Sequence, residues 1–331
     1  MTTKIDIYAH IIPEAFLKAM QERAYQAAAY YTSLASRVPS IIDLQVRFQI
    51  MDQFGEDYRQ VLNTAGFAQD LPTARLVNDT MAELVDRYPD RFVAFGATLP
   101  MADVEGALLE LDRAIGELGA RGIQLFANIN GIPLDDPRFF PIFERMAKHD
   151  LPIWLHPMRS SSLPDFATED RSRYLIWRVF GWPYETTAAL VRLVFAGYFK
   201  RFPNLKIIAH HAGGLLPHFA ERVRDHYDEY ILWQDEELQP GINELDGHPL
   251  DYLRLIYGDT ALSGSQGALN CALAFLGSDR LLFGSDFPFD IEKGARLVAA
   301  AVRGVEGLPV SPAEREAIFA GNAIRLLKLP S

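Results

Sequence analysis

Histidine and aspartate residues stand at the ends of several short apolar segments. Such segments end at His10, at His156, at the pair His210 and His211, and at Asp286. Imidazole nitrogens and carboxylate oxygens suit a divalent transition metal such as zinc or manganese. Three protein ligands leave positions open for water or substrate, as catalysis requires. We therefore expect a catalytic metal site, provided that the segments place these residues at one rim of the fold.

The segments that carry these residues belong to a repeating pattern in which a short apolar run precedes a helical pattern. The expected strands are Ile5–His10, Tyr58–Thr64, Phe92–Thr98, Gly122–Phe126, Pro152–His156, Lys206–His211, Leu255–Tyr257 and Leu281–Asp286. The expected helices are Ile42–Phe54, Thr73–Tyr88, Val104–Leu118, Phe139–His149, Tyr184–Arg201, Pro217–Tyr230, Ser265–Phe275, Ile291–Val305 and Pro312–Leu327. Several strands are continuously apolar, which is typical of parallel strands covered on both faces.

This pattern predicts a single (β/α)8 TIM barrel that occupies residues 1–331 as one domain. We expect an N-terminal insertion over Pro13–Pro39 and an arm after strand five over Met158–Pro183, because these connections are unusually long. A doubly wound open sheet is the alternative fold. The sequence has no GxGxxG after the first strand and no P-loop, which favours the barrel. Catalytic side chains of a barrel lie at the carboxyl ends of its strands.

Composition narrows the classes of partner. The chain has 331 residues, with 32 Lys and Arg against 43 Asp and Glu, and a net charge of −11. This balance argues against a nucleic acid or an anionic membrane surface as the main partner. The single cysteine, Cys271, excludes an internal disulfide and a cysteine-rich zinc site. The sequence shows no signal peptide and no apolar run long enough to span a membrane, so we expect a soluble cytoplasmic protein.

Five segments, in chain order, resemble the amidohydrolase superfamily, and within it the branch of aminocarboxymuconate-semialdehyde decarboxylase and γ-resorcylate decarboxylase. They are Asp6-Ile7-Tyr8-Ala9-His10, Arg47-Phe48-Gln49-Ile50-Met51-Asp52-Gln53-Phe54-Gly55, Leu155-His156-Pro157, His211-Ala212-Gly213-Gly214 and Gly284-Ser285-Asp286-Phe287-Pro288. Arg201-Phe202-Pro203-Asn204-Leu205, before strand six, also resembles this branch. The resemblance covers essentially the whole chain.

The resemblance implies that His10, His156 and Asp286 are metal ligands and that His211 orients a metal-bound water or moves protons. We prefer His211 over His210 because six residues separate it from Pro217, as in the family. Successive side chains of a strand point to opposite faces, so we also expect only one of His210 and His211 to face the barrel interior.

The resemblance further implies two arginines that bind substrate. Arg47 matches an arginine that holds a substrate carboxylate, for which a bidentate guanidinium is well shaped. Arg222 matches an arginine that in some members reaches into the site of the neighbouring subunit. A homodimer or a higher homo-oligomer is therefore expected.

Tyr8 departs from the family pattern, in which His-x-His or Glu-x-His occupies strand one. Asp6, Tyr8 and His10 share a face of the strand, so Tyr8 should point toward the metal region and the substrate. A neutral phenol is a poor ligand, because its ordinary pKa is about 10. Two interpretations stay open: Tyr8 packs or hydrogen-bonds beside the site, or it coordinates the metal as tyrosinate.

The function that the resemblance implies is a non-oxidative decarboxylation of a hydroxylated aromatic or muconate-like carboxylic acid. It depends on one divalent metal, zinc or manganese, with Asp286 or His211 as the proton donor. A hydrolase or hydratase that acts on a lactone, a C–C bond or an unsaturated acid is the first alternative. A barrel that binds a ligand without catalysis is the second.

Overall fold

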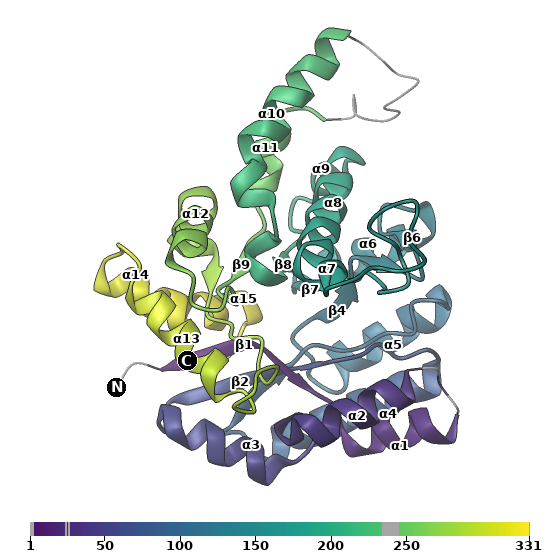
Figure 1. Ribbon diagram of the computed structural model, residues 1–331, viewed down its shortest axis with the longest axis vertical. Coiled ribbons are helices and arrows are strands. Elements are labelled where there is room, and N and C mark those ends of the chain that lie inside the picture. The colour runs from purple at the N-terminus through teal and green to yellow at the C-terminus, as the bar shows by residue number, and fades with distance from the viewer. Residues whose placement is uncertain (1–2, 24, 26, 234–244, 331) are drawn as a thin grey trace.

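The computed structural model describes residues 3–23, 25, 27–233 and 245–330. Its main strands form two parallel sheets, with the orders β1-β2-β3 and β10-β9-β8-β7-β4. These strands are β1 (Lys4–Ile11), β2 (Tyr58–Thr64), β3 (Phe92–Phe95), β4 (Ile123–Phe126), β7 (Ile153–His156), β8 (Ile207–Ala209), β9 (Tyr257–Asp259) and β10 (Leu281–Leu282). The prediction of an α/β fold with parallel strands is confirmed (Figure 1).

Backbone hydrogen bonds also link the two sheets at both of their edges. Beyond β3, the amide of Ala97 donates to Gly122 at 2.9 Å, and Ala97 accepts from Gln124 at 2.8 Å. At the other seam, the amide of Ile7 in β1 donates to Phe283 at 2.9 Å, just beyond β10. The first and last strands of the chain therefore lie next to each other.

Helices follow the strands, much as the sequence predicts. They are α3 (Leu44–Met51), α4 (Leu71–Arg87), α5 (Val104–Gly116), α6 (Phe140–His149), α8 (Gly181–Phe195), α9 (Tyr198–Arg201), α10 (Leu216–Trp233), α12 (Gln266–Leu276), α13 (Ala295–Glu306), α14 (Pro312–Glu316) and α15 (Asn322–Leu327). Short polar side chains cap several of them: Asp43, Asp70, Asp103 and Ser265 each accept backbone amides of the first turn. None of the helices in the described part of the chain combines the length and hydropathy that crossing a bilayer requires.

Two expected helices are interrupted. The expected helix Tyr184–Arg201 is divided into α8 and α9 at Gly197, which has a left-handed φ of 76°. The segment Pro312–Leu327 contains a π-helical turn over Ala317–Gly321, between α14 and α15. The structure also adds a small hairpin, β5 (Asn128–Ile129) with β6 (Ile132–Pro133), and the helix α11 (Pro249–Leu253). Local propensity at these short elements is too weak to predict them.

The two long connections differ in structure. The N-terminal one contains α1 (Glu14–Glu22) and α2 (Ala28–Arg37), and both α2 and α4 contact α1 (Figure 1). The arm after β7 is irregular until α7 (Ile176–Val179), which leads directly into α8.

The strands are buried on both faces, in agreement with their continuously apolar sequences. Every residue of β4 and β7 is buried, as is all of β1 beyond its first residue. One compact apolar cluster joins strand residues to the last helix. Its buried members are Ile5, Ile7, Tyr8, Val61, Ala94, Trp154, Ile208, Leu282, Ala320, Ala323, Leu326 and Leu327. This packing fixes the strand ends that carry the polar residues.

Candidate active site

Three histidines from distant parts of the chain meet in a buried cluster. His10 lies in β1, His156 ends β7, and His210 follows β8. The ring centroids are 5.2 Å apart for His10 and His156, 5.4 Å for His156 and His210, and 5.9 Å for His10 and His210. One ligand nitrogen from each lies within 4.8 Å of the others. We call these three residues the histidine cluster.

Asp286 closes the cluster from the loop after β10. Its Oδ1 lies 3.4 Å from Nε2 of His10 and 3.3 Å from Nε2 of His210. Burial acts to raise the pKa of Asp286, but the neighbouring imidazoles of His10, His210 and His211 outweigh it and hold this pKa well below its usual range. Asp286 is therefore a carboxylate that faces three imidazoles.

The orientation of two imidazoles suits metal binding. Nδ1 of His156 lies 2.7 Å from the carbonyl of Pro157, and Nδ1 of His10 lies 3.3 Å from the carbonyl of Thr64. Each Nδ1 therefore donates to a backbone carbonyl, which leaves the Nε2 lone pair free to bind a metal. Burial lowers the pKa of both histidines, which keeps the rings neutral. Nε2 of His10 is buried without a hydrogen-bond partner in the structure.

The residues at this site therefore fit a divalent ion. Two neutral imidazoles and one carboxylate form a donor set that zinc and manganese accept. Among the described residues, two groups have ligand atoms that all lie within 4.8 Å of one another: His10, His156 and His210, and His210, His211 and Asp286. Of the predicted ligands, His10 adjoins both His156 and Asp286.

The prediction that only one histidine of the pair His210 and His211 faces the site is wrong. The expected strand Lys206–His211 ends earlier, at Ala209, and His211 adopts a φ of 53°. Alternation along a strand no longer applies there, so both side chains approach Asp286. Nε2 of His211 lies 3.6 Å from Oδ2 of Asp286. His210 is fully buried, whereas 23% of the His211 side chain is exposed.

Asp259 is a further polar residue of this site that the sequence analysis missed. Its carboxylate pairs with Nδ1 of His210 and accepts the backbone amides of Ala212 and Ala261, at 3.3 and 3.0 Å. Burial lowers the pKa of His210, but Asp259 and Asp286 outweigh it and raise this pKa to about 9. The expected strand stopped at Tyr257, whereas β9 continues to Asp259. An aspartate two residues beyond the expected strand was the signal in the sequence that could have identified Asp259 as a site residue.

Tyr8 lies within the histidine cluster. Its ring stacks on His210 at 3.8 Å and lies 5.2 Å from His10. Burial, Asp259 and Asp286 raise its pKa well above the usual value, so the phenol is neutral. The hydroxyl is buried without a hydrogen-bond partner in the structure. Tyr8 therefore presents an unused hydrogen-bonding group beside the ligands.

The two predicted substrate-binding arginines lie outside the cluster. Arg47 is fully buried, and it donates to Gln60 at 2.8 Å and to the carbonyl of His10 at 2.9 Å. Its Nη2 is buried without a hydrogen-bond partner in the structure. Arg222 lies on α10 and is exposed, in a groove that it shares with Phe195 of α8. That groove includes no member of the histidine cluster.

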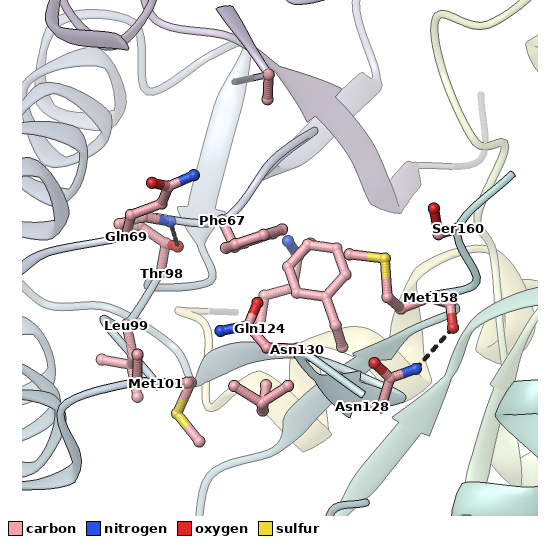
Figure 2. Close-up of a pocket in the computed structure, with 15 residues that line it drawn as sticks. Phe67, Gln69, Thr98, Leu99, Met101, Gln124, Asn128, Asn130, Met158 and Ser160 are labelled. Carbon is pink, nitrogen blue, oxygen red and sulfur yellow. Dashed lines mark hydrogen bonds between the residues drawn. The ribbon is translucent and has the colours of Figure 1, made fainter. Parts of the chain in front are cut away.

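A cavity of about 600 Å³ adjoins the cluster (Figure 2). Phe126 lines the cavity and its ring lies 5.1 Å from that of His156. Gln124 also lines it and donates to the carbonyl of Thr64, which His10 contacts as well. Its volume lies in the range of small-molecule sites. None of the described residues that line it is charged: they are Ala27, Phe67, Ala68, Gln69, Thr98, Leu99, Met101, Ala102, Gln124, Phe126, Asn128, Ile129, Asn130, Met158 and Ser160.

Comparison with known proteins agrees with this geometry. The family model described as amidohydrolase matches residues 5–329. A γ-resorcylate decarboxylase of Polaromonas sp. is 31% identical, over 99% of this chain and 99% of that protein. A 2-amino-3-carboxymuconate-6-semialdehyde decarboxylase of Dictyostelium discoideum is 29% identical, over 98% of this chain and 92% of its own length.

Solved structures extend the comparison to three dimensions. A 2,6-dihydroxybenzoate decarboxylase complexed with 2,6-dihydroxybenzoate matches with a TM-score of 0.79 and 27% identity, over 99% of this chain and 100% of that one. A dihydroxybenzoic acid decarboxylase from Polaromonas sp., with bound manganese and the inhibitor 2-nitroresorcinol, matches with a TM-score of 0.76 and 29% identity, over 99% and 97% of the two chains. Family model, relatives and structures all span nearly the whole sequence, and the chain belongs to the amidohydrolase family.

Proposed function

We propose that this protein is a metal-dependent, non-oxidative decarboxylase of a hydroxylated aromatic or muconate-like carboxylic acid. The observation that carries the proposal is that His10 adjoins both His156 and Asp286, within a cluster of histidines beside a neutral cavity. The relatives that share this chain's full length are named as decarboxylases of such acids. A small-molecule carboxylate is therefore the expected substrate.

We infer that the chain forms one closed (β/α)8 barrel domain over residues 1–331. The hydrogen bonds between Ala97 and Gly122 and between Ile7 and Phe283 support closure at the two seams. In such a barrel the ends of β1, β7 and β8 face one rim, where catalytic groups lie. The helices α1 and α2 are then the N-terminal insertion, and the residues from Met158 to Pro183 are the arm after strand five.

We assign His10, His156 and Asp286 as the residues that hold one divalent ion, manganese or zinc. The related Polaromonas enzyme carries manganese. When bound, such an ion supplies positive charge that stabilises the negative charge developing on substrate oxygens. Nε2 of His10 and of His156 are the imidazole donors, because both Nδ1 atoms are committed to backbone carbonyls.

The reaction consumes one proton, because the bond from the ring carbon to the carboxylate breaks and a C–H bond replaces it while carbon dioxide leaves. We assign this proton transfer to Asp286 and His211. Nε2 of His211 lies 3.6 Å from Oδ2 of Asp286, and His211 is partly exposed. His211 can therefore take a proton from solvent and present it beside the Asp286 carboxylate, which faces the site.

We assign Tyr8 as a residue that binds substrate through its hydroxyl. A buried hydroxyl without a partner costs free energy, which a substrate oxygen or an ordered water would recover. The raised pKa of Tyr8 keeps its proton in place for donation, and it disfavours coordination as tyrosinate.

The function is tested on the purified protein by elemental analysis, followed by incubation with hydroxylated benzoates. We expect about one manganese or zinc per chain, carbon dioxide release, and loss of release after chelation that returns when metal is restored. His218→Ala removes an exposed histidine of α10 and should leave the metal content and the carbon dioxide release unchanged. Incorporation of oxygen-18 from water without carbon dioxide would instead establish a hydrolase or hydratase.

We also propose that the active unit is a homodimer or a higher homo-oligomer in the cytoplasm. Exposed Arg222 supports this, because the arginine that it resembles enters the site of a neighbouring subunit in some members of the family. Large apolar side chains of the arm are exposed as well, including Phe166 at 72% and Phe180 at 62%. Light scattering after size-exclusion chromatography tests this state, and a monomer at all concentrations would contradict it.

A further inference from the structure

Arg178 lies in α7, above two aromatic rings that border the histidine cluster. Its guanidinium carbon lies 4.9 Å from the ring centroid of Trp182 and 5.8 Å from that of Phe289. Trp182 in turn lies 5.6 Å from the ring of His156, and Phe289 lies 5.2 Å from that of His10. A single ring therefore separates this cation from each of two metal-ligand histidines.

The guanidinium of Arg178 has no hydrogen bond and no ion pair with any residue that the structure describes. Two other arginines of the arm are paired: Arg159 lies 3.1 Å from Glu185, and Arg173 lies 3.7 Å from Glu169. Contact with aromatic faces holds Arg178 through cation–π attraction. A guanidinium that uses its face in this way keeps its N–H edge available for a planar anion such as a carboxylate.

Two aromatic rings near His156 lead to surroundings of different charge. Trp182 lies 5.6 Å from the ring of His156 and carries Arg178, whereas Phe126 lies 5.1 Å from it and lines the uncharged cavity. A substrate held against His156 therefore meets a cation toward the arm and amide and apolar groups in the cavity. Arg47, the predicted carboxylate-binding arginine, is fully buried and donates from Nε to Gln60 and from Nη1 to the carbonyl of His10.

We propose that Arg178 is a substrate-binding residue that pairs with the anionic oxygens of the substrate beside the histidine cluster, while the uncharged part of the substrate occupies the cavity. The proposal rests on the proposed function for the nature of the substrate. It narrows the substrate to aromatic acids whose ring substituents are neutral, such as hydroxyl or methyl groups. A second carboxylate directed into the cavity would lie among residues that offer it no positive charge.

The test compares the binding of an acid with that of its neutral analogue. The ligands are 2,6-dihydroxybenzoate and 2,6-dihydroxybenzamide, measured by calorimetry on the metal-loaded protein. Arg178→Gln should weaken binding of the acid by roughly 10- to 100-fold and change binding of the amide less than about twofold, because the lost contact is a charge-assisted pair. Arg178→Lys should retain part of the affinity, because it keeps the charge without the planar fork.

Arg173→Gln is the matched control: it removes the same charge from the same arm, and its side chain is 62% exposed. It should bind the acid within about twofold of the unchanged protein. If Arg178→Gln fails to fold, Arg178→Lys carries the comparison. Equal losses for acid and amide, unchanged acid binding, or no binding of the acid by the unchanged protein would each overturn the proposal.

The binding assay separates this inference from the proposed decarboxylation. Binding of the acid that depends on Arg178, without any carbon dioxide release, would refute the decarboxylase and leave the anion site standing. Carbon dioxide release with an unchanged KM in Arg178→Gln would support the decarboxylase and refute the anion site at Arg178. Isophthalate, which carries a second carboxylate, should bind at least about tenfold more weakly than benzoate, because an unpaired charge resists desolvation.

Discussion

Arg47 donates from Nη1 to the backbone carbonyl of His10 at 2.9 Å. The same guanidinium donates from Nε to Gln60, and its carbon lies 4.7 Å from the ring centroid of Phe287. Arg47 thus connects α3 to two parts of the site. One is the end of β1 at the candidate ligand His10, and the other is Phe287, which follows the candidate ligand Asp286. Its position fits a residue that orients the site from behind.

Arg47→Lys should therefore lower metal affinity and stability without a selective effect on substrate binding. Lysine keeps the charge but cannot donate to Gln60 and to His10 in the same fork geometry. We expect a loss of about 1–3 kcal/mol in the free energy of unfolding, measured with urea. Arg138→Lys, at a side chain that is 54% exposed, is the control. A rise in KM alone, at full metal content and unchanged stability, would restore Arg47 as a substrate-binding residue.

His211→Ala should reduce turnover by at least about 10²-fold if His211 moves protons to Asp286. Metal content should change little, because His10 and His156 supply the imidazole donors in our assignment. The measurement is the initial rate of carbon dioxide release, with His218→Ala alongside. Near-normal turnover in His211→Ala would remove this residue from the mechanism and leave His210 as the histidine near Asp286 that is not assigned to the metal.

Asp259→Asn should lower the pKa of His210 from about 9, because it removes the carboxylate that faces Nδ1. The readout is a titration of nitrogen-15-labelled histidine by NMR in metal-free protein. We also expect turnover to fall by at least about 10²-fold, since an amide can reverse the tautomer of the imidazole. Asp279→Asn, in the turn before β10, is a control of equal charge change. An unchanged titration of His210 would show that Asp259 does not set its protonation.

We expect the buried carboxyl group of Asp6 to make the free energy of unfolding depend on pH. Burial raises its pKa from 3.8 to about 6, and hydrogen bonds from Ser285 and Tyr58 offset only part of that rise. The folded state therefore retains a proton that the unfolded chain loses between about pH 4 and 6, so stability falls as pH rises through this window.

Asp6→Asn removes the titrating group. The loss of its hydrogen bonds lowers the free energy of unfolding by an amount that does not depend on pH. Relative to the unchanged protein, the variant should gain about 3 kcal/mol between pH 4 and pH 7, from a shift of about two pKa units. Urea unfolding of both proteins at each pH measures the difference. A difference that stays constant across this range would show that Asp6 has an ordinary pKa in the folded protein.

The strand pattern and its polar ends were accessible from the sequence because burial on both faces leaves continuous apolar runs. β2 occupies the expected residues, Tyr58–Thr64, and His10, His156 and Asp286 stand at the ends of apolar runs. Their residue types alone indicate a metal, since imidazole and carboxylate are its usual donors. Periodicity and residue chemistry are local properties, so the sequence determined them by itself.

Only the tertiary structure decided which neighbours complete the site. The early end of β8 and the left-handed backbone at His211 bring both His210 and His211 to Asp286, against strict alternation. The burial of Arg47 and the position of Arg178 over Trp182 depend on how α3 and the arm pack against the strands. Contacts of this kind join residues far apart in the chain, and side-chain direction there follows from packing, which no short sequence pattern encodes.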